Sequence, residues 1–185
     1  MNQNKTQDIK SYIDNFFPLL ENIIDNNMVI AGTLALKLHG LNFSRESGDL
    51  DIVLYQPTKK QIDILTILST FQVENPFKPI DEYSNNDQNK LLEKGIQKTI
   101  KFMKNGLYID FILEYNKPFP FVDLLQYKYV TKDLNIHYFN IQNILLNIMA
   151  KNSYILENGR DQLSIYRREK DMKDLIILKN ENFNF

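Results

Sequence analysis

Two aspartates separated by a single residue stand in a short alternating stretch of the chain. Asp49 and Asp51 flank Leu50 within residues 49–55, where apolar side chains alternate with others. Because side chains at i and i+2 of a β-strand share a face, we expect both carboxylates to project side by side. Like charges at that separation repel each other unless a cation lies between them. The pattern fits a divalent metal site, in which Mg²⁺ binds one or two carboxylates and substrate phosphates, and it also fits solvated carboxylates at a sheet edge.

A third aspartate, Asp110, interrupts the otherwise apolar stretch 107–113. Burying an unpaired charge is costly, so this side chain is expected either to face solvent on an edge strand or to face a cation. In the second case Asp110 would be directed at the same metal site as Asp49 and Asp51. The residues themselves leave both alternatives open.

Gly32 and Thr33 stand between a predicted strand and a predicted helix. Free backbone N–H groups and the helix dipole at such a junction favour a phosphate group. Three carboxylates and a phosphate-binding turn in one α/β domain are what two-metal phosphoryl or nucleotidyl transfer requires.

The elements that position these residues follow from periodicity in the first part of the chain. Apolar residues at helical spacing predict a helix over residues 9–20, which Pro18 should kink or restart. Residues 28–31 are typical of a buried strand, and residues 33–39 of a short helix closed by Gly40. Thr58 and Gln61 form the two ends of a capping box that opens a helix through residue 69.

Turn chemistry and apolar stripes organise the rest of the chain. Asn105-Gly106, between residues 99–103 and 107–113, predicts a β-hairpin with a type I′ turn. Residues 71–95 are polar and predict no clear element. The tail from residue 141 is expected to form two helices, the second with an apolar stripe at Met172, Leu175, Ile176 and Leu178. We therefore expect an α/β fold (α+β in the stricter sense), with a small mixed sheet flanked by helices and a C-terminal helical part.

Composition excludes several classes of function. The 185 residues carry a formal net charge of −1 and include no cysteine. The balanced charge excludes a broadly basic nucleic-acid coat, and the lack of cysteine excludes disulfides, thiolate zinc sites and thiol nucleophiles. No apolar run approaches ~18 residues and the polar start is unlike a signal peptide, so we expect a cytoplasmic protein without membrane contact. The length predicts a single domain over residues 1–185, with a core at about 28–115 and a helical part at about 137–180.

Three stretches together resemble the nucleotidyltransferase superfamily, which includes DNA polymerase beta. Residues 29–40 read VIAGTLALKLHG and residues 45–53 read RESGDLDIV, similar to the family pattern of a hydrophobic residue, Gly, then Gly or Ser, and later Asp-hydrophobic-Asp. Together with REKDMKDL at residues 168–175, they are most similar to small bacterial nucleotidyltransferases of the abortive-infection toxin type. The chain departs from the pattern at Thr33, where Gly or Ser is usual, and in the somewhat long spacer before Asp49.

This resemblance implies a nucleotidyltransferase-like α/β fold and Mg²⁺-dependent transfer of an NMP from an NTP to a hydroxyl acceptor on RNA, a small molecule or a protein. It implies catalytic and metal-binding roles for Asp49, Asp51 and Asp110, with two Mg²⁺ ions expected and Mn²⁺ as an alternative. The partners that it implies are the NTP, tRNA or another RNA as acceptor, and an antitoxin-like protein. The residues that it assigns to nucleotide binding are Gly32, Thr33, Arg45 and Lys151. For Arg45, an anchoring role in the loop before Asp49 is an equal alternative.

Two other functions stay open from the sequence. The chain could be a toxin–antitoxin component that acts through a protein partner, because partner surfaces leave no motif. It could also be a catalytically silent nucleotide-binding module, although the complete set of aspartates argues against this.

Other charged and polar side chains receive structural interpretations. His39, at a predicted helix end, and His137 are interpreted as structural. Lys101 belongs to a basic hairpin that could hold RNA phosphates, but lysines that protect an edge strand are the favoured interpretation. Asp171 and Asp174 are interpreted as salt-bridge partners on a helix face.

Overall fold

The structure, a computed structural model, describes residues 3–41, 48–70, 78–80, 98–115, 127–130, 135–141, 144 and 162–180. The strands are β1 (Met28–Ile30), β2 (Asp49–Tyr55), β3 (Lys78–Ile80), β4 (Lys98–Lys104), β5 (Leu107–Glu114), β6 (Tyr127–Val130) and β7 (Asn135–Tyr138). The helices are α1 (Gln3–Ile23), α2 (Gly32–Leu38), α3 (Lys59–Thr70) and α6 (Gln162–Asn180). The seven strands form one mixed sheet in the order β3-β4-β5-β2-β1-β7-β6, which confirms the predicted α/β class.

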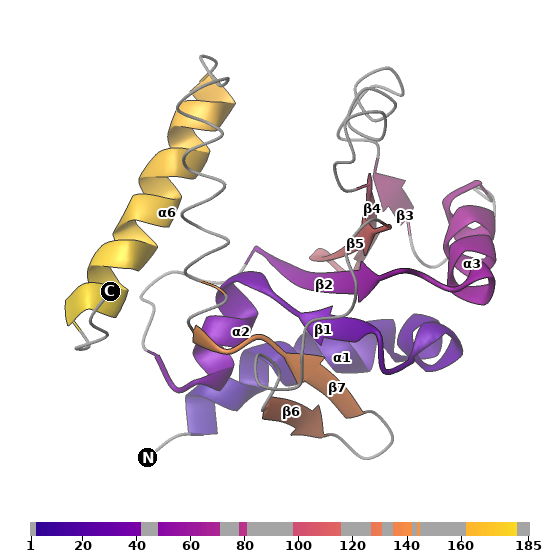
Figure 1. Cartoon of the computed structure of the whole chain (residues 1–185), viewed down its shortest axis with the longest axis horizontal. Coiled ribbons are helices and arrows are strands. Elements are labelled where there is room, and N and C mark those ends of the chain that lie inside the picture. The colour runs from indigo at the N-terminus through magenta and orange to yellow at the C-terminus, as the bar shows by residue number, and fades with distance from the viewer. Residues whose placement is uncertain are drawn as a thin grey trace.

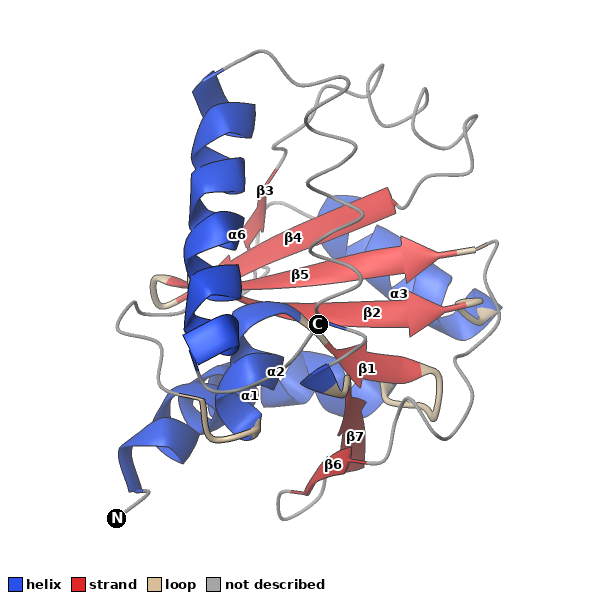
Figure 2. Ribbon diagram, turned by 60° about the vertical axis from the view of Figure 1, so that its left-hand side comes forward, coloured by secondary structure: helices blue, strands red, loops and turns tan. Residues whose placement is uncertain are grey.

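Helices lie on both sides of the sheet (Figures 1 and 2). Helix α1 contacts α2, α3 and β5, and α3 also contacts β3 and β4, so these three helices form one layer. In Figure 2, α6 crosses in front of the sheet, towards the ends at which β2 and β5 begin. Among the helices of the described ranges, none combines the length and the hydropathy that a bilayer crossing requires.

The core lies between the sheet and the first helical layer. Alternate residues of β2 and β5 face α1, and they are at most 1% exposed because the two layers close over them: Leu50, Ile52, Leu54, Ile109, Phe111 and Leu113. Phe16, Leu19 and Leu20 of α1 fill the same core and are equally buried. The intervening residues of β2 and β5, among them the three aspartates, therefore face the opposite side.

Pro18 lies inside helix α1, where the sequence predicted either a kink or a new start. The helix continues through Pro18 to Ile23 without a new start. The Pro18 ring removes one backbone donor, but Phe16, Leu19 and Leu20 are buried on either side of it. The Asn22 side-chain amide also donates to the Pro18 carbonyl oxygen, at 2.6 Å. Packing of the apolar face thus holds the helix together across the missing hydrogen bond.

Two local motifs form as the sequence predicts. At the start of α3, the Thr58 backbone N–H donates to Oε1 of Gln61 at 2.9 Å, and the Gln61 backbone N–H donates to Oγ1 of Thr58 at 3.3 Å. Asn105 and Gly106 have φ values of 54° and 78°, as a type I′ turn requires. This turn joins β4 to β5 and pairs Lys104 with Leu107.

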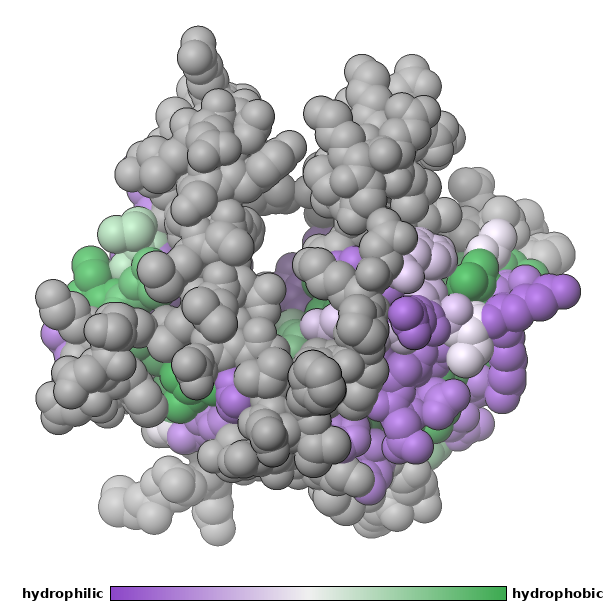
Figure 3. All heavy atoms as spheres, in the orientation of Figure 1, coloured by the Kyte–Doolittle hydropathy of each residue, from purple (hydrophilic) through white to green (hydrophobic). Residues whose placement is uncertain are grey.

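Helix α6 is present as predicted, but only Leu175 and Leu178 of its expected apolar stripe pack against the core. Met172 and Ile176, two residues of the expected apolar stripe, are 44% and 55% exposed, whereas Leu178 is fully buried. Figure 3 shows a hydrophobic area over this helix, at the left of the view. Asp171 and Asp174 are 6% and 3% exposed, so their carboxylates lie on the inner face and not on a solvated one. Residues 171, 174 and 178 share one side of the helix. Prediction from residue type alone misses this face, because two of its three residues are charged.

Candidate metal centre

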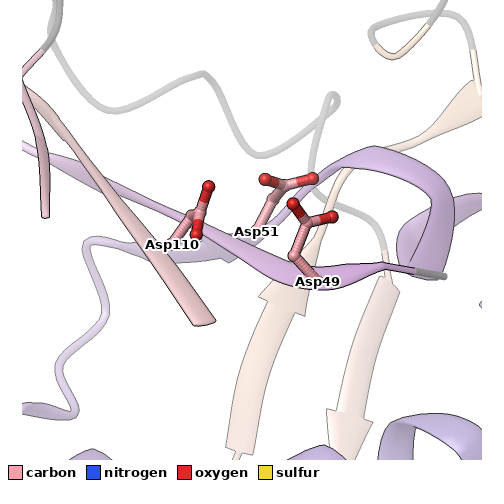
Figure 4. Close-up of side chains that lie close together, drawn as sticks. All are labelled: Asp49, Asp51 and Asp110. Carbon is pink, nitrogen blue, oxygen red and sulfur yellow. The ribbon is translucent and has the colours of Figure 1, made fainter. Parts of the chain in front are cut away.

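The carboxylates of Asp49, Asp51 and Asp110 converge on one face of the sheet. Each offers one oxygen atom, and these three atoms all lie within 4.8 Å of one another. Figure 4 shows the side chains projecting from the same side of the ribbon. The convergence predicted for Asp110 is therefore confirmed, and the alternative of an edge carboxylate directed elsewhere is wrong.

Strand pairing produces this arrangement. β2 and β5 are parallel neighbours, and their register places Asp51 opposite Asp110. Asp49 is two residues before Asp51 on the same strand, so it shares its face. Because both strands lie inside the sheet, with β4 and β1 on their outer sides, the three carboxylates are fixed by two paired backbones.

The burial and chemistry of this group fit a divalent cation. The side chains of Asp49 and Asp110 are 30% and 13% exposed, so water reaches the group but surrounds none of it fully. Adjacent carboxylates repel each other more strongly when they are partly removed from water, and a nearby cation relieves the repulsion. Carboxylate oxygens are hard ligands that suit Mg²⁺, Mn²⁺ or Ca²⁺. These residues could hold a metal ion without rearrangement of the strands.

A cationic side chain that sequence reasoning did not assign to the site lies beside the carboxylates. Nζ of Lys101 lies 3.2 Å from Oδ2 of Asp110 and 3.7 Å from Oδ2 of Asp49. The interpretation of Lys101 as protection of a sheet edge is wrong, because β3 pairs with the outer side of β4. A signal was available: a two-residue turn at Asn105-Gly106 fixes the hairpin register, and that register puts Lys101 opposite Asp110.

The first residue of α2 lies directly against the Asp51 carboxylate. Gly32 has a φ of +63°, and a Cβ at this position would overlap the Asp51 carboxylate. The Ala31 backbone N–H donates to the Asp51 carbonyl oxygen at 2.9 Å, which ties the end of β1 to β2. Gly32 is thus placed next to Asp51, and Thr33, the following residue of α2, is half-buried.

The remaining predicted residues lie away from this group or outside the described ranges. Arg45 and Lys151 belong to stretches that the structure does not describe. Nε2 of His39 is 2.8 Å from the Phe139 carbonyl oxygen, and its ring meets that of Tyr138 edge to face. Burial lowers the pKa of His39, and the hydrogen bond to Phe139 partly opposes this. A neutral ring that donates to the backbone agrees with the structural interpretation of His39.

Comparison with known proteins adds little to this geometry. No family model matches the chain, and no curated protein matches it. A solved structure of a candidate nucleotidyltransferase from H. pylori is 13% identical, covering 96% of this chain and 79% of the other, with a TM-score of 0.37. A likeness this weak carries no argument about the site or its function. The case for a metal centre therefore rests on the three carboxylates of this chain and the residues packed against them.

Proposed function

We propose that this chain is a divalent-metal-dependent nucleotidyltransferase, which moves an NMP from an NTP to a hydroxyl acceptor. The observation that carries the proposal is the position of three carboxylate oxygens, from Asp49, Asp51 and Asp110, within 4.8 Å of one another. The resemblance of the Gly32-Thr33 and Asp49-Leu50-Asp51 motifs to the nucleotidyltransferase superfamily supports it, since these two motifs are adjacent in the structure.

The three aspartates take different roles in this proposal. Asp49 and Asp51 would hold two Mg²⁺ ions, and Asp110 would help to hold the ion that activates the acceptor hydroxyl. Bound divalent ions would increase the acidity of the acceptor hydroxyl and stabilise the charge that develops on the transferred phosphoryl group. The acceptor oxygen forms a bond to the α-phosphorus while the bond from that phosphorus to the bridging oxygen breaks, and pyrophosphate leaves. Asp110 receives the hydroxyl proton as general base.

The turn at Gly32-Thr33 is proposed to bind the β- and γ-phosphates through its backbone. In support, the absence of a side chain at Gly32 lets the backbone approach the Asp51 carboxylate closely, and phosphate oxygens that share a metal with Asp51 would lie nearby. Nucleotide-binding roles for Arg45 and Lys151 follow from the family resemblance and stay predictions.

The proposal is tested by transfer of label from nucleotide to acceptor. The chain is incubated with each of the four α-³²P-labelled NTPs, Mg²⁺, and either total RNA or cell lysate. We expect one NTP to label an RNA, a protein or a small molecule. Asp110→Asn should lower the rate by about 10²- to 10⁴-fold, the range that loss of a general base produces.

The matched control is Asp63→Asn, which makes the same chemical change on the exposed side of α3 and should leave transfer unchanged. Absence of label in every acceptor pool with all four NTPs would contradict the enzymatic proposal. If NTP and Mg²⁺ still raised the melting temperature in that case, the silent nucleotide-binding module would be the better account.

A further inference from the structure

We propose that Lys101 competes with divalent cations for the carboxylates of Asp49 and Asp110 and thereby sets the metal affinity of the site. The inference rests on the metal centre of the proposed function and adds a positioning residue to it. Nζ of Lys101 is 3.2 Å from Oδ2 of Asp110 and 3.7 Å from Oδ2 of Asp49. That ammonium group interacts with two of the three residues proposed as metal ligands.

The fold holds the Lys101 side chain in this position. The hairpin register places its backbone opposite Asp110, and pairing of β3 with the other side of β4 fixes that strand on both sides. The side chain is only 11% exposed, and Nζ lies 5.7 Å from the centre of the Tyr108 ring. Lys101 is therefore a packed component of the acidic face and differs from the solvated lysines of an exposed strand.

Electrostatics then couples Lys101 to metal binding. A lysine ammonium is a compact single positive charge, and it neutralises part of the repulsion among the carboxylates. A divalent ion needs the same oxygen atoms, so the ammonium must either give up these contacts or stay beside a like charge. Both outcomes weaken metal binding, because the interaction of one charge with two at about 5 Å corresponds to roughly tenfold in affinity even in a high dielectric.

Neutralising Lys101 should therefore lower the melting temperature of the metal-free chain and raise its affinity for a divalent ion. Without divalent ions in solution, the folded variant lacks the charge that pairs with Asp49 and Asp110, and its melting temperature falls. With a divalent ion present, the more negative site binds it more tightly. A tighter-binding ion stabilises the folded variant more by mass action. The difference in melting temperature between the variant and the wild type therefore becomes smaller when the ion is present.

The experiment measures the Mn²⁺ dissociation constant and the melting temperature with and without Mn²⁺. Lys101→Met removes the charge and keeps the apolar stem. Lys101→Gln also removes the charge but keeps a hydrogen-bond donor for Asp110, and it serves if the first variant does not fold. Lys101→Arg keeps the charge. Lys104→Met makes the same change in net charge on the same strand, three residues along and so on the other face.

We expect Lys101→Met and Lys101→Gln to bind Mn²⁺ about tenfold more tightly than the wild type, with lower melting temperatures in the absence of Mn²⁺. Lys101→Arg and Lys104→Met should stay within about threefold of the wild-type dissociation constant. If the wild type binds Mn²⁺ and the neutral variants bind equally or more weakly, the role of Lys101 is refuted while the metal site stands. If the neutral variants bind Mn²⁺ and the wild type does not, Lys101 competes with the metal as proposed, but the wild type is not a metal-dependent enzyme. If no variant binds Mn²⁺, both proposals are wrong.

Discussion

Replacement of Gly32 by alanine should show how the first residue of α2 affects the acidic site. Gly32 has a φ of +63°, and an added Cβ would overlap the Asp51 carboxylate. Gly40, at the other end of the same short helix, has a φ of +82°, but an added Cβ would meet no atom within 4 Å. Gly40→Ala therefore carries the cost of the backbone conformation alone, and it is the matched control.

The magnitudes follow from these two environments. An alanine with positive φ costs about 1–2 kcal/mol, and this term applies to both variants. At Gly32, Asp51 must also leave its rotamer, which adds about 0.5–1.5 kcal/mol. For a chain of this size each 1 kcal/mol lowers the melting temperature by about 2–4 °C. Gly32→Ala should thus melt about 1–6 °C below Gly40→Ala.

The assay is thermal denaturation of both variants with and without Mn²⁺. Because a displaced Asp51 no longer meets the other carboxylates, Gly32→Ala should also lose most of the Mn²⁺-dependent rise in melting temperature, whereas Gly40→Ala should keep it. In an Asp51→Ala background the extra cost of Gly32→Ala should disappear, as a thermodynamic cycle between contacting residues requires. Equal melting temperatures and equal Mn²⁺ responses for the two glycine variants would refute the proposed contact.

Two further predictions concern the scaffold. Gln61 is 2% exposed, and its side-chain amide donates to the Ile23 carbonyl oxygen at 2.8 Å and to Oδ1 of Asn27 at 2.9 Å. Gln61→Ala should therefore lower the free energy of unfolding, measured by urea denaturation, by about 2–3 kcal/mol. A loss below about 0.5 kcal/mol would show that these hydrogen bonds do not stabilise the fold. Burial lowers the pKa of His39 below its usual 6.5, so the unfolded chain binds the proton more readily and stability should fall as pH drops below 6.5. Melting temperatures of His39→Gln between pH 7.5 and 5 should depend less on pH than those of the wild type; identical profiles would show that His39 does not contribute.

Short-range patterns predicted the parts of the fold that short-range forces determine. The capping box of Thr58 and Gln61 and the turn at Asn105-Gly106 each depend on two residues a few positions apart, and both formed as expected. The alternation of residues 49–55 correctly separated Leu50 from its two acidic neighbours, because a strand has only two faces.

Long-range pairing could not be derived in the same way. The site depends on the parallel register of β2 with β5, which places Asp51 opposite Asp110. Periodicity carries no information on which strands become neighbours, so the prediction for Asp110 depended on its lone charge in an apolar strand and on the family resemblance. Lys101 was within reach of sequence reasoning through the hairpin register. It was overlooked because lysine on a strand is typical of an exposed edge.

The burial of Asp171 and Asp174 on α6 also could not be predicted from the sequence. Prediction from residue type put Met172 and Ile176 inside, yet Asp171 and Asp174 are the buried pair. Leu175 and Leu178 of the expected stripe do pack against the core, so residue type predicted half of the buried face. The surface that α6 meets follows from the tertiary fold and not from the helix sequence.

The most direct test of the central claim is nucleotide binding by Asp51→Asn. This change is nearly isosteric and removes one carboxylate from the group of three, and Asp63→Asn is again its control. Calorimetric titration with the NTP that stabilises the wild type, in the presence of Mg²⁺, gives the dissociation constants. If the carboxylates hold the metal that the nucleotide needs, Asp51→Asn should bind at least about tenfold more weakly, while Asp63→Asn binds as the wild type does. Equal affinities for Asp51→Asn and the wild type would contradict the metal centre.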